Sequence, residues 1–181
     1  KRASSSRRLS RFLANGAVRV RAWYESTMTA LLQAAASSGQ VRLIIDATQV
    51  AQSHQLLMVA LAYRRRALPI AWTWVRVAKG HSSGGKQVAL LGYVQRLMPP
   101  QVMVVLTGDS EFTPLQAQLE TWGWFYVLRQ KGSHLCRPQP DQPWQRVESL
   151  LDSPGQQCWL SAIELTEQHR LPCNFLAYWR R

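Results

Sequence analysis

Two aspartates each follow an apolar run of the sequence. Asp46 comes directly after VRLII (41–45), and Asp109 ends VMVVLTGD (102–109). Short apolar runs of this kind predict buried strands, and a carboxylate that loses its water without gaining a partner is costly. A divalent cation would provide that partner for both acids, and oxygen ligands suit Mg²⁺ or Mn²⁺.

A pair of such ions suits chemistry on phosphodiesters, because two metals can clamp the attacking and the leaving oxygen of an in-line displacement. The overall charge agrees with a polyanionic partner: 22 Lys and Arg face 10 Asp and Glu, which leaves a net charge of +12. Nucleic acid is the simplest such partner. The alternative reading is structural, with Asp46 starting a turn and Asp109 capping a helix over 112–121.

The elements that must position these acids follow the order β-β-β-α-β-α-β. Strands are expected over 41–48, 56–64, 67–77, 102–109 and 124–130, and helices over 86–98 and 112–123. Short links make the first three strands an antiparallel meander, and right-handed helical crossovers add the later strands in parallel. The result is an α/β fold with a mixed sheet and helices on its faces. If the fourth strand lies beside the first, Asp46 and Asp109 emerge at one edge.

The first 24 residues form a basic segment with seven Lys and Arg and no acid before Glu25. Two short helices are expected there, the second over 20–36. Arg7, Arg8 and Arg11 are candidates for sequence-independent contacts with a DNA backbone. The other reading of this segment is a solvated basic face.

The rest of the composition excludes several classes of protein. Cys136, Cys158 and Cys173 form no Cys-x-x-Cys pair, and the four His show no ligand spacing, so structural zinc and a disulfide framework are not expected. No apolar run approaches the roughly 20 residues needed to cross a bilayer. Beyond residue 132, RPQPDQP (137–143) predicts a loop, and short strands are expected near 157–165 and 173–179.

A rival site lies in the stretch from Gly80 to Lys86, which fits the G-x-x-x-x-G-K frame of a phosphate-binding loop. Position 87 is Gln, so the hydroxyl that would bind Mg²⁺ is missing. The preceding strand also carries Thr73, Arg76 and Lys79, unlike a fully buried parallel strand. A glycine-rich link into a helix is the better account.

Several motifs together resemble a known family. They are LIIDATQV (43–50), VALAYRRRALPIAWTWV (59–75), KQVALLGYVQRLM (86–98), VVLTGDSEF (104–112) and WGWFYVLRQKG (122–132). In this order they are similar to the catalytic core of bacterial insertion-sequence transposases of the insertion-sequence-four type. That group carries a DDE triad on a ribonuclease-H-like fold. The resemblance runs from about Arg8 to Gly132 and is fainter beyond.

The resemblance implies roles for several residues. Asp46 and Asp109 would be the first two catalytic acids and would ligate two Mg²⁺ or Mn²⁺ ions for strand cleavage and strand transfer. Lys131 would contact DNA, because the family often has Lys-Gly after the fifth strand. Glu111 and Phe112 match the family's pattern after the second Asp, whereas Ser110 stands where Arg is common.

The third acid of the family is a Glu inside a Tyr-x2-Arg-x3-Glu-x6-Lys pattern on a later helix. Tyr178 and Arg181 satisfy Tyr-x2-Arg, but CNFLAYWRR (173–181) resembles a strand more than that helix, and the sequence ends before the Glu. Glu148, Glu164 and Glu167 are not assigned this role. We therefore expect a chain cut before its third acid, with a basic helical segment (1–38), the first part of a catalytic core (39–132) and part of a β-rich insertion (133–181).

The expected function is that of a DNA transposase, with this chain inactive on its own. Its partners would be double-stranded DNA (terminal inverted repeats and target) and a second copy in a synaptic homodimer. It would act in the bacterial cytoplasm near the nucleoid, and no association with a membrane is expected. Two alternatives stay open, namely a ribonuclease-H-like nuclease or resolvase, and a non-catalytic basic DNA-binding remnant.

Overall fold

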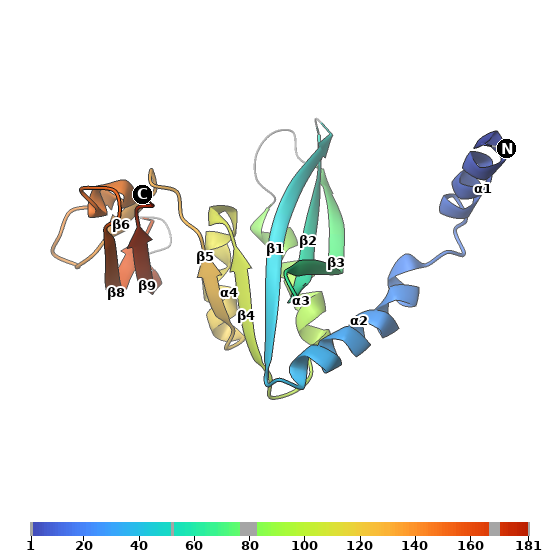
Figure 1. The fold of residues 1–181 in the computed structure, drawn as a ribbon, viewed down its shortest axis with the longest axis horizontal. Helices are drawn as coiled ribbons and strands as arrows, with labels where there is room; N and C mark the ends of the chain where they lie inside the picture. The colour runs from blue at the N-terminus through green and yellow to red at the C-terminus, as the bar shows by residue number, and fades with distance from the viewer. Residues whose placement is uncertain (1, 52, 77–82, 167–170, 181) are drawn as a thin grey trace.

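The computed structural model describes residues 2–51, 53–76, 83–166 and 171–180, and it contains two β-sheets preceded by a pair of helices (Figure 1). The helices are α1 (Arg2–Leu13), α2 (Val20–Ala36), α3 (Gly84–Leu97) and α4 (Gln116–Thr121), with 3₁₀ helices η1 (Ser110–Leu115) and η2 (Val147–Leu150). The strands are β1 (Gln40–Ala51), β2 (His54–Tyr63), β3 (Arg66–Arg76), β4 (Met103–Gly108), β5 (Phe125–Leu128), β6 (Leu135–Arg137), β7 (Gln145–Arg146), β8 (Gln157–Leu165) and β9 (Leu171–Tyr178).

The larger sheet has the strand order β3-β2-β1-β4-β5. β1, β2 and β3 pair antiparallel, whereas β4 pairs in parallel with β1, and β5 in parallel with β4. Helix α3 connects β3 to β4, and η1 with α4 connects β4 to β5, because parallel neighbours need a crossover rather than a tight turn. The expected α/β fold with a mixed sheet is confirmed.

The main core lies on one face of this sheet. Along β1, Val41, Leu43 and Ile45 are buried, while Arg42 and Asp46 between and after them are exposed. This alternation follows from the period-two direction of side chains in a strand. The buried face packs against apolar residues of α2, α3, η1 and α4, including Met28, Leu32, Leu91, Leu115 and Leu119.

The opposite face of the sheet, called the open face here, is covered less: Arg42 and Asp46 are exposed on it, and Ile44 is half-buried. It carries Arg42, Ile44 and Asp46 of β1 and the side chains at matching positions of the other strands. Helices were expected on the faces of the sheet; α2, α3, η1 and α4 pack on the buried face. Large apolar side chains of the open face are therefore exposed: Trp74 by 57%, Phe125 by 60% and Val127 by 63%.

The segment after β4 differs from the expected helix over 112–123. It begins earlier, at Ser110, and its first six residues form the 3₁₀ helix η1 rather than an α-helix. Pro114 lies inside this stretch and has no backbone N–H to donate, which favours a short irregular turn over a regular helix. The expected end is confirmed, because Gly123 follows α4 with φ +65°, the left-handed conformation that ends many helices.

The smaller sheet has the order β7-β6-β8-β9 and its own apolar core. Cys136, Ile163, Leu165, Phe175 and Ala177 form this second core. β8 spans the residues expected, and β9 begins two residues before the strand expected at 173. The three cysteines are free thiols.

Helix α1 lies apart from both sheets and is joined to them through α2 (Figure 1). Its apolar residues Leu9 and Phe12 are 59% and 49% exposed. The two helices expected in this segment are present, and α2 covers the expected residues 20–36.

Gly108, the last residue of β4, lies where a larger residue would not fit. A Cβ atom at this position would lie 2.9 Å from Ile45 Cγ2 and 2.9 Å from Phe112 Cδ2. Gly108→Ala should therefore lower the free energy of unfolding by about 1–3 kcal/mol through overpacking, measured by urea denaturation. Gly85→Ala is the matched control. It adds the same methyl group in the first turn of α3, where no atom lies within 4 Å, so it should leave stability unchanged or raise it. Equal effects of both substitutions would contradict this account.

Candidate metal and nucleic-acid site

The parallel pairing of β1 with β4 brings Asp46 and Asp109 to matching positions. The ladder runs from Gln40 opposite Met103 to Ile44 opposite Thr107 with a constant offset of 63 residues. Continued by two residues, the same offset sets Asp46 opposite Asp109. Asp109 keeps an extended backbone, with φ −96° and ψ −171°. Neighbouring strands lie about 4.8 Å apart, so this register makes the two acids neighbours on adjacent strands. β1 continues to Ala51, however, so Asp46 lies in the middle of its strand and does not start a turn.

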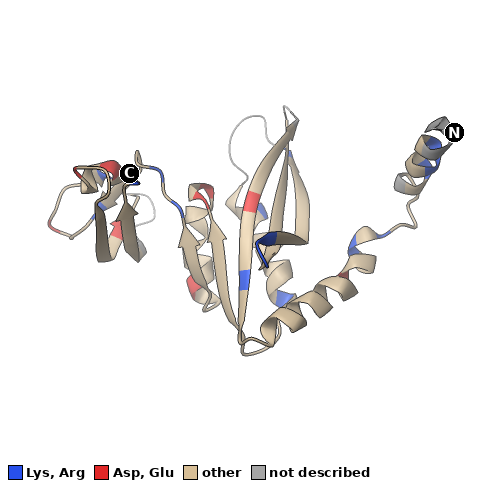
Figure 2. Cartoon of the chain, in the orientation of Figure 1, with Lys and Arg blue, Asp and Glu red and all other residues tan. Residues whose placement is uncertain are grey.

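Both acids belong to the open face by the alternation of their strands. Asp46 follows the buried Ile45 and pairs across to Met58 of β2. Asp109 follows Gly108, whose missing Cβ would point into the core. Asp46 is exposed and Asp109 is half-buried. The pair is therefore accessible from solvent. Asp46, the acid of β1, appears as the red band on this strand, well away from its ends (Figure 2).

Each carboxylate also makes a local hydrogen bond. The backbone N–H of Ala47 donates to Asp46 Oδ1 at 2.9 Å, and that of Glu111 donates to Asp109 Oδ1 at 2.9 Å. Asp109 is thus the N-cap of η1, as the structural alternative expected. Within the described ranges the second oxygen of each carboxylate accepts no hydrogen bond. Capping and metal ligation are compatible, because they use different oxygens.

A third ligand does not join the pair among the residues that the structure describes, where no group of three His, Cys, Asp or Glu is close enough to hold a metal ion. Glu164 of β8 is paired with Arg137, and Glu148 of η2 with Arg146 at 3.2 Å. Glu167 and Arg181 lie outside the described residues.

The candidate DNA contacts fall into two separate places. Lys131 is exposed and follows β5, the strand beside β4, by three residues. Arg7, Arg8 and Arg11 are exposed on α1, which lies apart from the sheets (Figure 2). The structure therefore places Lys131 after the strand that neighbours β4 and the three arginines on a separate helix.

The rival phosphate-binding frame is only partly visible, because Gly80, His81 and Ser82 lie outside the described residues. Ser83 precedes α3 in an extended conformation, and Lys86 is exposed in its first turn. Gln87 is 1% exposed and belongs to the interior. The described part of the frame is thus the start of a helix that packs on the sheet.

A polar network beside Asp109 was not anticipated from the sequence. The His134 ring nitrogen Nδ1 lies 2.9 Å from Gln130 Oε1, an acceptor, so Nδ1 carries the proton. Gln130 Nε2 donates to Thr113 Oγ1 at 3.0 Å, and the Thr113 hydroxyl donates to the Ser110 carbonyl at 2.9 Å. The network ties the segment after β5 to η1. No spacing rule connects residues 113, 130 and 134, so only the tertiary structure could reveal it.

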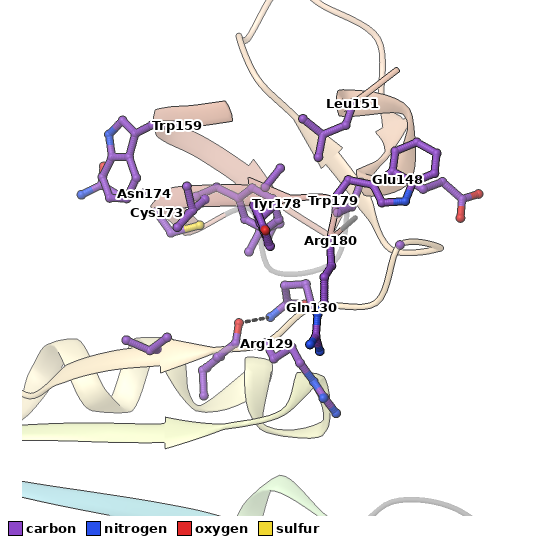
Figure 3. Close-up of a pocket in the computed structure, with 18 of the residues that line it drawn as sticks. Arg129, Gln130, Glu148, Leu151, Trp159, Cys173, Asn174, Tyr178, Trp179 and Arg180 are labelled. Carbon is purple, nitrogen blue, oxygen red and sulfur yellow. Dashed lines mark hydrogen bonds between the residues drawn. The ribbon is translucent and has the colours of Figure 1, made fainter. Parts of the chain in front are cut away.

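A pocket of about 1320 Å³ lies between the end of β5 and the smaller sheet (Figure 3). Trp159, Tyr178 and Trp179 contribute aromatic surface, and Arg180 extends toward the wall that carries Arg129 (Figure 3). Neither Asp46 nor Asp109 lines it. Its mixture of aromatic, cationic and anionic side chains favours no single ligand, so no reaction is assigned to it.

Comparison of the chain with protein-family models and with curated proteins found no match. In the described part of the chain, the helices are too short or too polar to span a bilayer. The site must accordingly be interpreted from its own geometry.

The cap made by Asp109 predicts different effects for two substitutions. Asp109→Asn keeps a side-chain oxygen that can accept from the Glu111 N–H, whereas Asp109→Ala removes the acceptor. In metal-free buffer Asp109→Ala should therefore be less stable than Asp109→Asn by about 1 kcal/mol, measured by urea denaturation. If the two variants unfold at the same denaturant concentration, the cap does not stabilise this end of the sheet.

His134 predicts a dependence of stability on pH. Burial of the ring lowers its pKa below 6.5, and the nearby charge of Lys131 lowers it further. Because the unfolded chain then binds a proton more readily, stability should fall as pH drops below about 6.5 and level off beneath the folded-state pKa. NMR titration should show the lowered pKa, and Lys131→Gln should raise it part of the way. Lys86→Gln is the control, and an unchanged His134 pKa in Lys131→Gln would contradict the role of Lys131.

Proposed function

We propose that the chain is part of a metal-dependent DNA transposase of the DDE type, with a ribonuclease-H-like catalytic sheet. The observation that carries the proposal is the β1–β4 register, which, continued by two residues, sets Asp46 opposite Asp109 on the open face. Asp109 follows the carboxyl end of β4, where α/β active sites commonly gather, and Asp46 lies beside it within β1.

The strand order supports the same family. Three antiparallel strands followed by two parallel ones, in the order β3-β2-β1-β4-β5, agree with the fold that the resemblance implies. A mixed sheet alone is shared by many α/β proteins. The support comes from the combination of this order with an acid in the central strand β1 and another directly after its parallel neighbour β4.

Asp46 and Asp109 fit a magnesium site. Mg²⁺ is commonly held by one or two carboxylates and completes its shell with water, and Asp46 and Asp109 offer carboxylate oxygens that the local hydrogen bonds leave open. When two ions are bound, they would supply the Lewis acidity for hydrolysis and transfer of a phosphodiester. The cap at Glu111 and the network through Thr113 hold Asp109 in place, so its carboxylate needs little reorganisation to bind.

The basic residues fit a DNA partner. Lys131 is exposed after β5, the strand next to β4, and Arg7, Arg8 and Arg11 are exposed on helix α1. Contacts of these side chains with phosphates would position a duplex without reading its sequence. Terminal repeats, target DNA and a synaptic homodimer are the partners that this function implies.

A second candidate function is a basic DNA-binding module without catalysis. It is favoured by one observation, namely that no third metal-ligating side chain joins the pair among the described residues. A related nuclease or resolvase would use the same two acids. These functions differ in what the aspartates do, so the aspartates are the residues to test.

The first test is metal binding by the chain. Mn²⁺, followed by electron paramagnetic resonance, should bind to the wild-type chain and at least roughly tenfold more weakly to Asp46→Asn and to Asp109→Asn, because each loses one charged ligand. Asp141→Asn is the matched control, since Asp141 is an exposed acid in the loop between β6 and β7. Equal Mn²⁺ affinity in all four proteins would remove the proposed metal site.

The second test separates an enzyme from a binder. Supercoiled DNA is incubated with the chain and Mg²⁺, and nicked circles are quantified. Nicking that disappears in Asp109→Asn but not in Asp141→Asn supports a catalytic site. DNA binding and Mn²⁺ binding without nicking are expected both of the non-catalytic module and of a transposase core that is inactive on its own, whereas equal nicking by all variants overturns the assignment of Asp109.

A further inference from the structure

The turn between β2 and β3 has an unusual sequence for its backbone. Tyr63 and Arg66 form the last pair of the hairpin, so Arg64 and Arg65 alone make the turn. Their φ values are +43° and +66°. Two-residue hairpin turns with positive φ at both positions strongly favour Asn-Gly or Asp-Gly, because those residues tolerate the left-handed region.

Two arginines at these positions are a local conflict between sequence and structure. Left-handed backbone is unfavourable for residues that have a Cβ and a long side chain. Strain of this kind often persists where side chains are needed for function. The turn is thus better explained by what its side chains do than by its own stability.

The side chains of this turn are free to meet a partner. Arg64, Arg65 and Arg66 are all exposed, and within the described part of the chain no acid pairs with them. The Arg64 guanidinium carbon lies 5.2 Å from the centre of the Tyr63 ring, which orients that side chain. Three adjacent guanidinium groups on a tight turn form a compact positive tip, which we call the arginine tip (Arg64–Arg66).

The arginine tip lies in line with the candidate site along β1. The β1–β2 register continues from Leu43 opposite Leu61, which sets Tyr63 opposite Val41. Arg66 of the tip pairs with Tyr63, and Asp46 is five residue steps along β1 from Val41, or about 17 Å at roughly 3.3 Å per residue. Arg42 lies between them, exposed on the open face, and the one blue and one red band on β1 show this order of charges (Figure 2).

This spacing matches double-stranded DNA. Phosphates of one strand advance by about 3.4 Å of helix axis per base pair, so about 17 Å corresponds to roughly five base pairs of a duplex lying along β1. Guanidinium groups are well suited to phosphate, because they offer a planar fork of donors. A duplex with one phosphate at Asp46 and Asp109 would have other phosphates within reach of the tip.

We infer that the arginine tip, with Arg42 beside it, is a DNA-backbone clamp that holds a duplex on the open face about five base pairs from the aspartate pair. The inference rests on the proposed function, which supplies DNA as the partner. Basic groups near the two acids would offset the repulsion between these carboxylates and the phosphates. It adds a contact region that is distinct from α1 and Lys131, on the other side of the acids from Lys131 along the strands.

The test exploits the strain of the turn. Arg64→Asn with Arg65→Gly installs the sequence that the backbone prefers, so this variant should melt at a higher temperature than the wild type and cannot fail merely by unfolding. Binding of a 20-base-pair duplex is measured by fluorescence anisotropy at several KCl concentrations in EDTA. Without metal the result does not depend on catalysis, so failure here is distinguishable from failure of the aspartate assignment.

Loss of two phosphate contacts has a defined signature. The slope of log K against log salt should become shallower by about 1.8, and affinity at 0.15 M salt should fall roughly fivefold per contact. Arg64→Lys with Arg65→Lys should restore most of the slope, because it keeps both charges. The matched control is Arg96→Gln with Arg146→Gln, which removes the same charge from α3 and β7 and should leave the slope unchanged.

Three outcomes would overturn the inference. One is a stabilised turn variant that binds DNA with the wild-type slope. Another is an equal change of slope in the control, which would mean that only the total charge matters. The third is unchanged DNA binding together with weaker binding to anionic phospholipid vesicles, which would assign the tip to a membrane surface.

Discussion

The parallel pairing of β1 with β4 is the constraint on which the candidate site depends. The two strands are distant in sequence, and helix α3 brings them together by packing Leu90, Leu91 and Val94 into the main core. The Thr107 hydroxyl donates to the Leu43 carbonyl at 3.0 Å and adds a cross-strand link. If β4 slipped by one residue against β1, its exposed side chains would turn into the core. Burial of Leu106 therefore also keeps Asp109, three residues later, on the open face.

One face of the larger sheet forms the main core, and the other face carries the candidate site. One face buries aliphatic side chains against α2, α3, η1 and α4, and this burial supplies most of the favourable free energy. The open face keeps Arg42 and Asp46 in water, where a charge costs little. Gly108 lies between the core and Asp109. Because it has no Cβ, Phe112 of η1 can pack closely against Ile45.

Positive charge is distributed over separate elements rather than gathered into one patch. Helix α1, the arginine tip and Lys131 lie on different parts of the chain, and each is exposed. A long polyanion can touch all of them, whereas a small anion can touch only one. In a chain of net charge +12, this distribution fits the extended polyanionic partner proposed above.

The order of strands and helices, the two candidate acids and the basic character of the N-terminal helices could be predicted from the sequence. Those features depend on local periodicity and on residue type, which short stretches of sequence carry. The mid-strand place of Asp46, the 63-residue register, the exposure of one face, the 3₁₀ start after Asp109 and the network from His134 to Ser110 emerged only in the tertiary structure. The left-handed turn at Arg64 and Arg65 likewise runs against local preference. The reason is physical: register, face and strain are set by contacts between segments far apart in the chain, and no single segment contains that information.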